Sequence, residues 1–341
     1  MPDFERLKRL GSGNFGEVWL VFDKALGVRR AVKYVDPSRI HDPTNFYQEP
    51  KTLMALRHEN IVRVEDAGIL SSGALYISME YLRRGSIDSK YKGAPVPLSR
   101  SLAMLQDVCW GLEYAHEKGY IHRDTKPANI LIGDLNKAKL SDFGLAVKVP
   151  RGASASPYGY LTHVAPEVFS TGSTTVQSDI YALGVTAYRI VNGDGFLPEI
   201  SDTGEIQDAI ISGDYPNRNH YRPFIPTRLK RVINRCMAVD PSERYGSAAE
   251  FRKALEKIHV HCDWKWKRVR KRIEYATLIG ANRILVTVEE LPSGRFSITT
   301  RKISQSGTIR RVMRDCENEM PLSRMKVRIR SILSRYVEKG R

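Results

Sequence analysis

The sequence predicts an α+β fold of two lobes, followed by a small basic α+β module. Three observations lead to this prediction. Residues 4–35 alternate apolar and polar positions around glycines, as antiparallel strands do. From about residue 99 onward, apolar positions recur with the 3.6-residue period of helices. Beyond residue 261 the composition becomes strongly basic.

Length and charge predict where the chain divides. The chain has 341 residues, 42% of them hydrophobic, which is enough apolar material for a real core. Its formal net charge is +16, and residues 262–341 supply +12 of it through 20 basic and 8 acidic side chains. We therefore expect lobes at 1–81 and 82–260 and a basic module of unknown function at 261–341. The charged first residues, and the lack of a run of roughly 18 apolar residues, predict a soluble cytoplasmic protein.

The first lobe is expected to be mostly β. Two or three antiparallel strands cover residues 4–35, and a short helix carries Leu53 and Leu56 on one face. The segments IVRV at 61–64 and ALYISME at 74–80 are predicted to be further strands.

The second lobe is expected to be mostly helical. Leu102, Leu105, Leu112 and His116 follow helical spacing from residue 99 onward. Further helical patterns occupy residues at about 177–192, 227–238 and 246–258.

Three glycines stand between two strand patterns near the start, in the segment GSGNFG. Gly11, Gly13 and Gly16 leave backbone N–H groups free to close over a phosphate chain. A dinucleotide-binding fingerprint would require a helix after the glycines, whereas residues 17–22 have a strand pattern. The alternative interpretation is an ordinary glycine-rich hairpin.

Lys33 lies in an apolar strand pattern, AVK. Because an isolated buried ammonium group is costly, it is expected to meet anions. Glu49 in the next helical segment is one candidate partner, and nucleotide phosphates are another. A surface lysine is the alternative.

A polar segment, YIHRDTKPANIL, joins a helix and a strand at 120–131. Asp124 can accept a proton from an attacking hydroxyl, Lys126 can neutralise a transferring phosphoryl group, and Asn129 can offer an oxygen to a cation. Asp142, in the following SDFG segment, is the stronger metal candidate. These residue types at this spacing indicate phosphoryl-transfer chemistry.

In this order the motifs resemble those of eukaryotic-type (Hanks-type) Ser/Thr protein kinases, over residues 4 to about 260. The resemblance implies a bilobal protein-kinase-like fold, with ATP and Mg²⁺ as cofactors and protein substrates that include the chain itself. Lys126 after the HRD motif points to Ser or Thr as acceptor. The positions implied to bind ATP are Gly11, Gly13, Gly16, Val18, Ala31, Lys33, Met79, Glu80, Leu82 and Leu131.

The resemblance also implies catalytic and supporting roles. Asp124 is the implied base, Lys126 a phosphate contact, Lys33 and Glu49 a catalytic ion pair, and Asn129 and Asp142 the Mg²⁺ ligands. The implied supporting positions are Arg123, Asp179, the Glu167–Arg244 pair and an apolar spine of Leu53, Val64, His122 and Phe143. Ser154, Ser156 and Thr162 are possible phosphorylation sites in the activation segment.

The sequence also departs from the family pattern. Pro50 directly follows Glu49 in the expected helix, where an interior proline removes a helical hydrogen bond. Tyr160 and His163 replace a threonine and a tyrosine that usually precede the APE motif. A pseudokinase or nucleic-acid-binding adaptor is the competing class of protein.

The basic module resembles no family. Trp264 and Trp266 alternate with cations, as in contacts to nucleic acid or another anionic partner, although Trp can equally pack on the kinase lobe. Residues 284–291 and 295–303 predict a hairpin, and 322–338 a helix. Arg324, Arg328 and Arg335 on the polar side of that helix form either a phosphate-binding surface or a solvated face. Docking of the module on the catalytic lobe for autoregulation is a further possibility.

Overall fold

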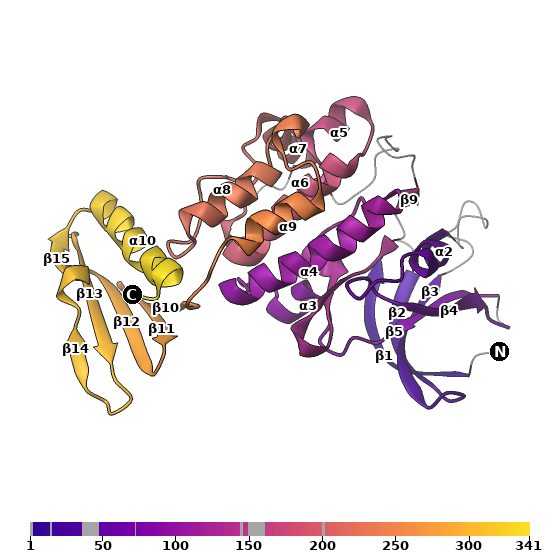
Figure 1. The fold of residues 1–341 in the computed structure, drawn as a ribbon, viewed down its shortest axis with the longest axis horizontal. Coiled ribbons are helices and arrows are strands. Elements are labelled where there is room, and N and C mark those ends of the chain that lie inside the picture. Colours follow the sequence, from indigo (N-terminus) through magenta and orange to yellow (C-terminus); the bar gives the residue numbers. More distant parts are fainter. Residues whose placement is uncertain are drawn as a thin grey trace.

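We describe the fold from a computed structural model, which places residues 3–13, 16–35, 48–71, 73–143, 146–148, 161–199 and 202–341. A β-rich lobe lies at one end of an elongated molecule, a helical lobe lies in the middle, and the basic module lies at the opposite end (Figure 1). Among the described residues, no helix is both long and apolar enough to cross a bilayer.

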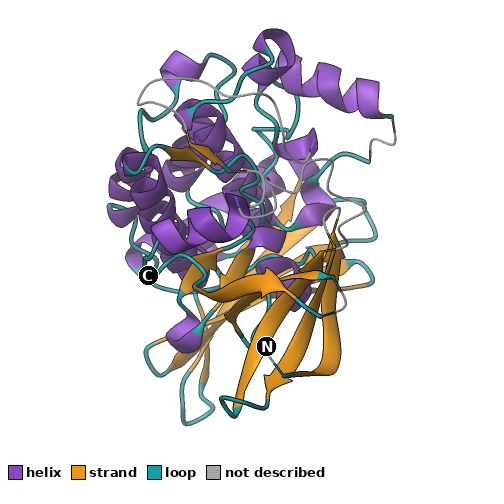
Figure 2. Cartoon of the chain, turned by 90° about the vertical axis from the view of Figure 1, so that its right-hand side faces the viewer, coloured by secondary structure: helices purple, strands orange, loops and turns teal. Residues whose placement is uncertain are grey.

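The N-terminal lobe contains a five-stranded sheet in the order β1-β2-β3-β5-β4. Figure 2 shows strands around the N-terminus in the lower part of the molecule. Its neighbouring strands are all antiparallel. The strands are β1 Phe4–Gly13, β2 Gly16–Asp23, β3 Val28–Val35, β4 Val64–Ile69 and β5 Leu75–Glu80, with helix α2 at Gln48–Ala55. The predicted sheet is therefore confirmed.

One predicted strand was wrong in its bounds. Of the IVRV segment only Val64 belongs to β4. The preceding backbone pairs instead with the second lobe, because Val62 N–H donates to Leu140 O at 2.9 Å and Leu140 N–H donates to Asn60 O at 2.8 Å. This pairing ties the two lobes together beside the site.

Helices dominate the C-terminal lobe, as predicted. They are α3 Ile87–Tyr91, α4 Leu98–Glu117, α5 Pro166–Thr171, α6 Val176–Asn192, α7 Thr203–Ser212, α8 Thr227–Cys236 and α9 Ala248–Glu256. Two short strand pairs frame the polar loop that follows α4. They are β6 Tyr120–Ile121 with β9 Val147–Lys148, and β7 Ile130–Ile132 with β8 Ala138–Leu140.

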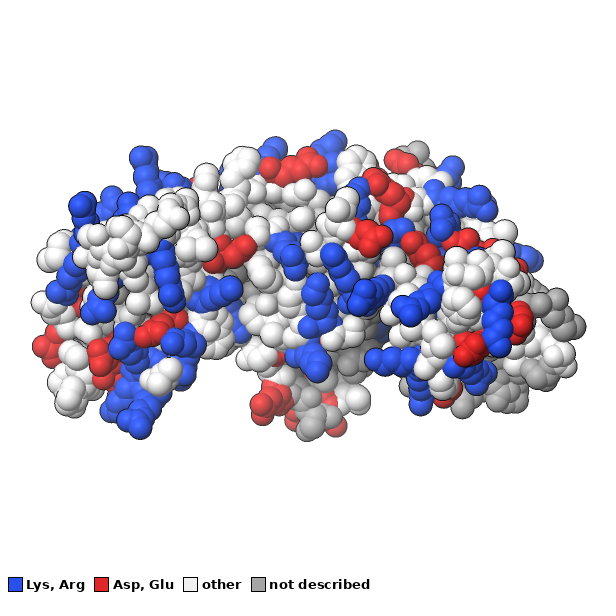
Figure 3. Space-filling model, turned by 90° about the horizontal axis from the view of Figure 1, so that it is seen from below, with Lys and Arg blue, Asp and Glu red and all other residues white. Residues whose placement is uncertain are grey.

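The module is richer in β-structure than expected. The predicted hairpin and helix are present, but the sheet has six strands: β10 Lys265–Val269, β11 Arg272–Ile279, β12 Asn282–Glu290, β13 Phe296–Ile303, β14 Ile309–Arg311 and β15 Glu317–Met320. Helix α10, Leu322–Lys339, packs its apolar residues into the module's core. Side chains of Lys and Arg are dense over this end of the molecule (Figure 3).

Trp264 and the three arginines singled out on α10 make contacts within the module itself. The Trp264 indole is buried and donates to Leu333 O at 3.1 Å. Arg324 pairs with Glu317 at 2.6 Å and Arg335 with Asp315 at 2.5 Å, while Arg328 lies 3.7 Å from Glu317. The polar face of α10 is thus partly neutralised within the module.

The module packs against the far end of the C-terminal lobe. Their buried apolar residues form one continuous cluster. Asp263 accepts hydrogen bonds from the backbone and hydroxyl of Ser99, and the Arg222 guanidinium lies 4.8 Å from the Trp266 ring centroid. Because the module lies at the opposite end from the N-terminal lobe, it does not cover the face between the two lobes (Figure 1).

Lys230 of α8 lies near Arg330 of α10 at this junction, and the burial of Lys230 together with their repulsion makes the stability of the fold depend on pH. Burial, reinforced by repulsion from Arg330, lowers the pKa of Lys230 to about 8. The unfolded chain therefore binds more protons above pH 8, up to the ordinary lysine value of about 10.4, so the free energy of unfolding should rise with pH across this window. Urea unfolding at several pH values should show this rise in the wild type and a smaller rise in Lys230→Met. Equal slopes would contradict it.

Candidate active site

The glycine-rich segment is a hairpin between β1 and β2. Gly13 pairs with Gly16 and Gly11 with Val18, and a strand follows, so the dinucleotide-fold alternative is excluded. Gly16 has φ +144°, and a Cβ atom there would lie 2.0 Å from Tyr34 O. Only glycine fits at that position, which fixes a close approach of the hairpin to β3.

Apolar side chains share a face of the N-terminal sheet with Lys33. Val18 lies directly opposite Lys33, and Ala31 lies opposite Met79. Residues that face each other in a ladder lie on the same side of the sheet. All three apolar side chains, with Leu82 and Leu131, are only half-buried, and such a surface suits a flat apolar ring.

Glu80 at the end of β5 has a local structural role. Its Oε1 accepts the Arg63 backbone N–H at 2.8 Å and the Lys139 ammonium at 2.7 Å. The Glu80 side chain therefore holds the end of β5 to the backbone just before β4 and to Lys139 of β8.

Lys33 reaches across to the second lobe. Its side chain is buried, and Nζ lies 3.3 Å from Asp142 Oδ1. Asp142 adopts φ +61°, which is uncommon for a residue other than glycine. Burial disfavours its charge, but the attraction and hydrogen bond of the Lys33 ammonium outweigh burial, so the pKa of Asp142 is lowered. The carboxylate is ionised at neutral pH.

The predicted Lys33–Glu49 pair stays a prediction, because the Glu49 side chain lies outside the described residues. The helix itself is described, and it begins at Gln48. Pro50 therefore falls in the first turn, where its missing N–H would have no intrahelical partner in any case. Pro50 is compatible with a helix that carries Glu49.

Asp124 has a polarised carboxylate. Its Oδ2 accepts hydrogen bonds from Lys126 Nζ and Asn129 Nδ2, each at 2.8 Å. Its Oδ1 is buried and has no hydrogen-bond partner within the described part of the chain. A buried carboxylate oxygen without a donor is costly, and a substrate hydroxyl would satisfy it.

The backbone around Asp124 is held by Asp179 of α6. Asp179 accepts the N–H groups of His122 and Arg123, each at 2.8 Å, which supports the αL conformation of Arg123, φ +67°. His116 Nε2 lies 2.8 Å from the same carboxylate. Helical spacing predicts that His116 shares a face with Leu112, but nothing in the local sequence indicates that it meets Asp179.

His122 and Phe143 lie together beneath the loop. Their ring centroids are 4.6 Å apart with an edge-to-face geometry. Burial lowers the pKa of His122 despite the opposing attraction of Asp179 and Asp124, so the imidazole is neutral at physiological pH. Leu53 and Val64, the other two predicted spine positions, are also buried.

The donor set fits Mg²⁺ bound together with nucleotide phosphates. Asn129 uses its amide nitrogen on the backbone and side chain of Asp124, so its amide oxygen is left for another ligand. Asp142 supplies an ionised carboxylate. Among the described residues no group of three His, Cys, Asp or Glu could hold a metal alone. Mg²⁺ is typically held by one or two protein ligands plus phosphate oxygens and water.

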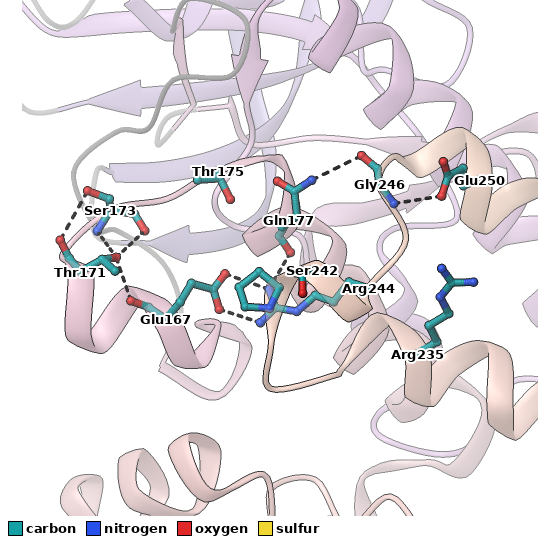
Figure 4. A pocket seen from close by; sticks show the side chains of 11 residues that line it. Glu167, Thr171, Ser173, Thr175, Gln177, Arg235, Ser242, Arg244, Gly246 and Glu250 are labelled. Carbon is teal, nitrogen blue, oxygen red and sulfur yellow. Dashed lines mark hydrogen bonds and ion pairs between the residues drawn. The ribbon is translucent and has the colours of Figure 1, made fainter.

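Glu167 and Arg244 form an ion pair in which the arginine is fully buried. The Arg244 guanidinium donates hydrogen bonds of 2.8 and 2.6 Å to the two carboxylate oxygens of Glu167. Both residues line a pocket of about 780 Å³ (Figure 4). Sequence reasoning missed this pocket, because its other residues, such as Gln177, Arg235 and Glu250, come from separate elements. Ser154 and Ser156 lie outside the described residues, whereas Thr162 lies 3.1 Å from His163 Nδ1.

Comparison with known proteins agrees with this geometry. Residues 4–257 match the protein kinase domain family. The chain is 33% identical to serine/threonine-protein kinase PknB of Mycobacterium leprae over 262 residues, 73% of this chain and 42% of that protein. It is 32% identical to serine/threonine-protein kinase Pkn1 of Myxococcus xanthus over 74% of this chain and 38% of that protein. This chain thus spans less than half the length of these relatives. On its motifs, its fold and this match, the chain belongs to the protein kinase family.

Proposed function

We propose that the chain transfers the γ-phosphoryl group of Mg-ATP to Ser or Thr hydroxyls of protein substrates, itself included. The arrangement of Asp124 carries this proposal. One of its oxygens is held by Lys126 and Asn129, and the other is buried without a donor. A seryl or threonyl O–H that donates to this oxygen would be aligned for attack and could pass its proton to the carboxylate.

The surrounding residues have separate roles in this proposal. Lys33 and Lys126 offset negative charge on phosphate oxygens, and Asn129 and Asp142 would hold Mg²⁺, which supplies further charge neutralisation when bound. Val18, Ala31, Met79, Leu82 and Leu131 would cover the adenine ring. Most of the rate enhancement would then come from positioning and electrostatics, as phosphoryl transfer requires.

The adaptor alternative is less favoured. Binding of single-stranded nucleic acid relies on aromatic side chains free to stack on bases. Trp264 is buried in the module's core, and Trp266 lies against the Arg222 guanidinium of the kinase lobe. An anionic partner at the module's basic surface stays a proposal.

The choice of acceptor can be tested with a generic basic protein, such as histone, that offers Ser, Thr and Tyr. After incubation with γ-labelled Mg-ATP, acid hydrolysis should release label as phosphoserine or phosphothreonine. Label found only in phosphotyrosine would contradict the proposed acceptor class.

A further inference from the structure

The β13–β14 hairpin ends in an exposed cluster of hydroxyls. Ser304 Oγ lies 2.8 Å from Ser306 Oγ, which lies 3.2 Å from Thr308 Oγ1. Ser304 Oγ also accepts the Thr308 N–H at 3.0 Å, which fixes the turn. The Ser306 hydroxyl bonds to two other hydroxyls and to no backbone group, and Ser306 is exposed. A change at Ser306 therefore leaves the backbone hydrogen bonds of the turn in place.

Four cations flank this turn in opposed pairs. The ladder places Lys302 directly opposite Arg310 and Arg301 directly opposite Arg311. Like charges directly opposite each other destabilise a strand pair. Among the described residues, Arg301, Lys302 and Arg310 form no ion pair with a carboxylate. The hairpin therefore carries uncompensated positive charge at its tip.

Side-chain alternation directs part of this charge toward the hydroxyls. Ser304 and Thr308 lie just beyond the two strands and continue their pairing, because Ser304 N–H donates to Thr308 O at 2.9 Å. By alternation along this continued ladder, Lys302 shares a face with Ser304, and Arg310 with Thr308. A phosphate group brings about −1.5 to −2 charges and three strong acceptor oxygens. A phosphate on the central hydroxyl would lie beside the Lys302–Arg310 pair and relieve its repulsion.

We propose that Ser306 is phosphorylated by the active site of a second copy of this chain. This inference rests on the proposed function. The Ser306 oxygen forms a bond to the γ-phosphorus, the bond from that phosphorus to the ADP oxygen breaks, ADP leaves with the electron pair, and the hydroxyl proton passes to Asp124. The module lies at the far end of the molecule from the N-terminal lobe, so the hairpin cannot reach its own catalytic loop (Figure 1).

The hairpin can open to enter another active site. Strand β14 has only three residues, Ile309–Arg311, and two of its three ladder pairs are the cation pairs. Few backbone bonds and two repulsive contacts favour local separation of β14 from β13. Once modified, the same cations would hold the phosphate and close the hairpin.

The module offers a matched control in Ser293, at the tip of the β12–β13 hairpin. Ser293 is also exposed, but it donates to Glu319 Oε1 at 3.1 Å. Glu319 is also paired with Arg295 at 3.3 Å. A phosphate on Ser293 would meet a carboxylate instead of free cations, so Ser293 should stay unmodified.

The test uses an Asp124→Asn chain, distinguishable by mass, as substrate for the wild-type chain, with Mg-ATP and histone present. We expect phosphate on Ser306 of the inactive chain, none on Ser293, and an initial rate proportional to wild-type concentration. Labelled histone with an unmodified Ser306 would overturn this inference and leave the proposed function intact. If neither histone nor Ser306 is labelled, both this inference and the proposed kinase function are overturned.

Amide hydrogen exchange provides a second measurement. Phosphorylation should slow exchange at 309–311 by about fivefold, as expected from relief of a like-charge pair. The slowing should be lost in a Lys302→Ala, Arg310→Ala variant that still accepts phosphate. Unchanged exchange in the phosphorylated wild type would overturn the electrostatic basis of the site.

Discussion

Asp124→Asn should lower kcat for phosphoryl transfer by about 10²–10⁴. The substitution keeps the size of the side chain and a hydrogen-bonding oxygen for Lys126, but an amide cannot take up the hydroxyl proton. Because Asp124 approaches the acceptor and not the adenine, the affinity for ATP should stay unchanged. Initial rates of transfer to histone, with nucleotide binding measured separately, would check both statements.

Asp134→Asn is the matched control for this variant. Asp134 is an exposed aspartate ten residues further along the same lobe. The control should transfer phosphate at the wild-type rate. A decrease of less than about tenfold in Asp124→Asn would contradict the assignment of Asp124 as the proton acceptor.

Arg244→Ala should lower the free energy of unfolding by about 3–5 kcal/mol, the range for breaking a buried ion pair. The Arg244 side chain is fully buried. Besides its two bonds to Glu167, it donates to the carbonyl oxygens of Gln177, Ala238 and Val239. Truncation would leave the Glu167 carboxylate without its arginine partner and would remove one donor from each of three carbonyl groups.

Urea unfolding of this variant can be compared with that of Arg235→Ala. Arg235 lines the same pocket but is exposed, with its guanidinium 4.4 Å from the Tyr245 ring centroid. Its loss should cost about 0.5–1 kcal/mol, the value for an exposed cation–π contact. If the free energy of unfolding falls equally in Arg244→Ala and Arg235→Ala, the hydrogen bonds of Arg244 do not stabilise this part of the lobe.

Local spacing was enough to predict the catalytic loop. Asp124, Lys126 and Asn129 lie within six residues, so their contacts are set by one turn of backbone, and the sequence pattern already indicates their chemistry. The strands and long helices were predictable for a similar reason, because their apolar periodicity is continuous along the chain.

Long-range contacts were not predictable in this way. His116 meets Asp179 across 63 positions, and no local signal links them. The module's edge strands also escaped prediction, since β10 is exposed at every position and β14 has three residues. Such strands lack the alternation that a buried face imposes. The ion pairs of α10 likewise required the fold to bring Asp315 and Glu317 beside the helix.

The central claim is that the γ-phosphoryl group goes to a protein hydroxyl and not to water. The most direct measurement follows γ-labelled ATP with the wild-type chain and histone, with and without Mg²⁺, and compares label in protein with label in inorganic phosphate. We expect Mg²⁺-dependent label on Ser or Thr that exceeds the inorganic phosphate released. Bound ATP with no label in protein would contradict the account.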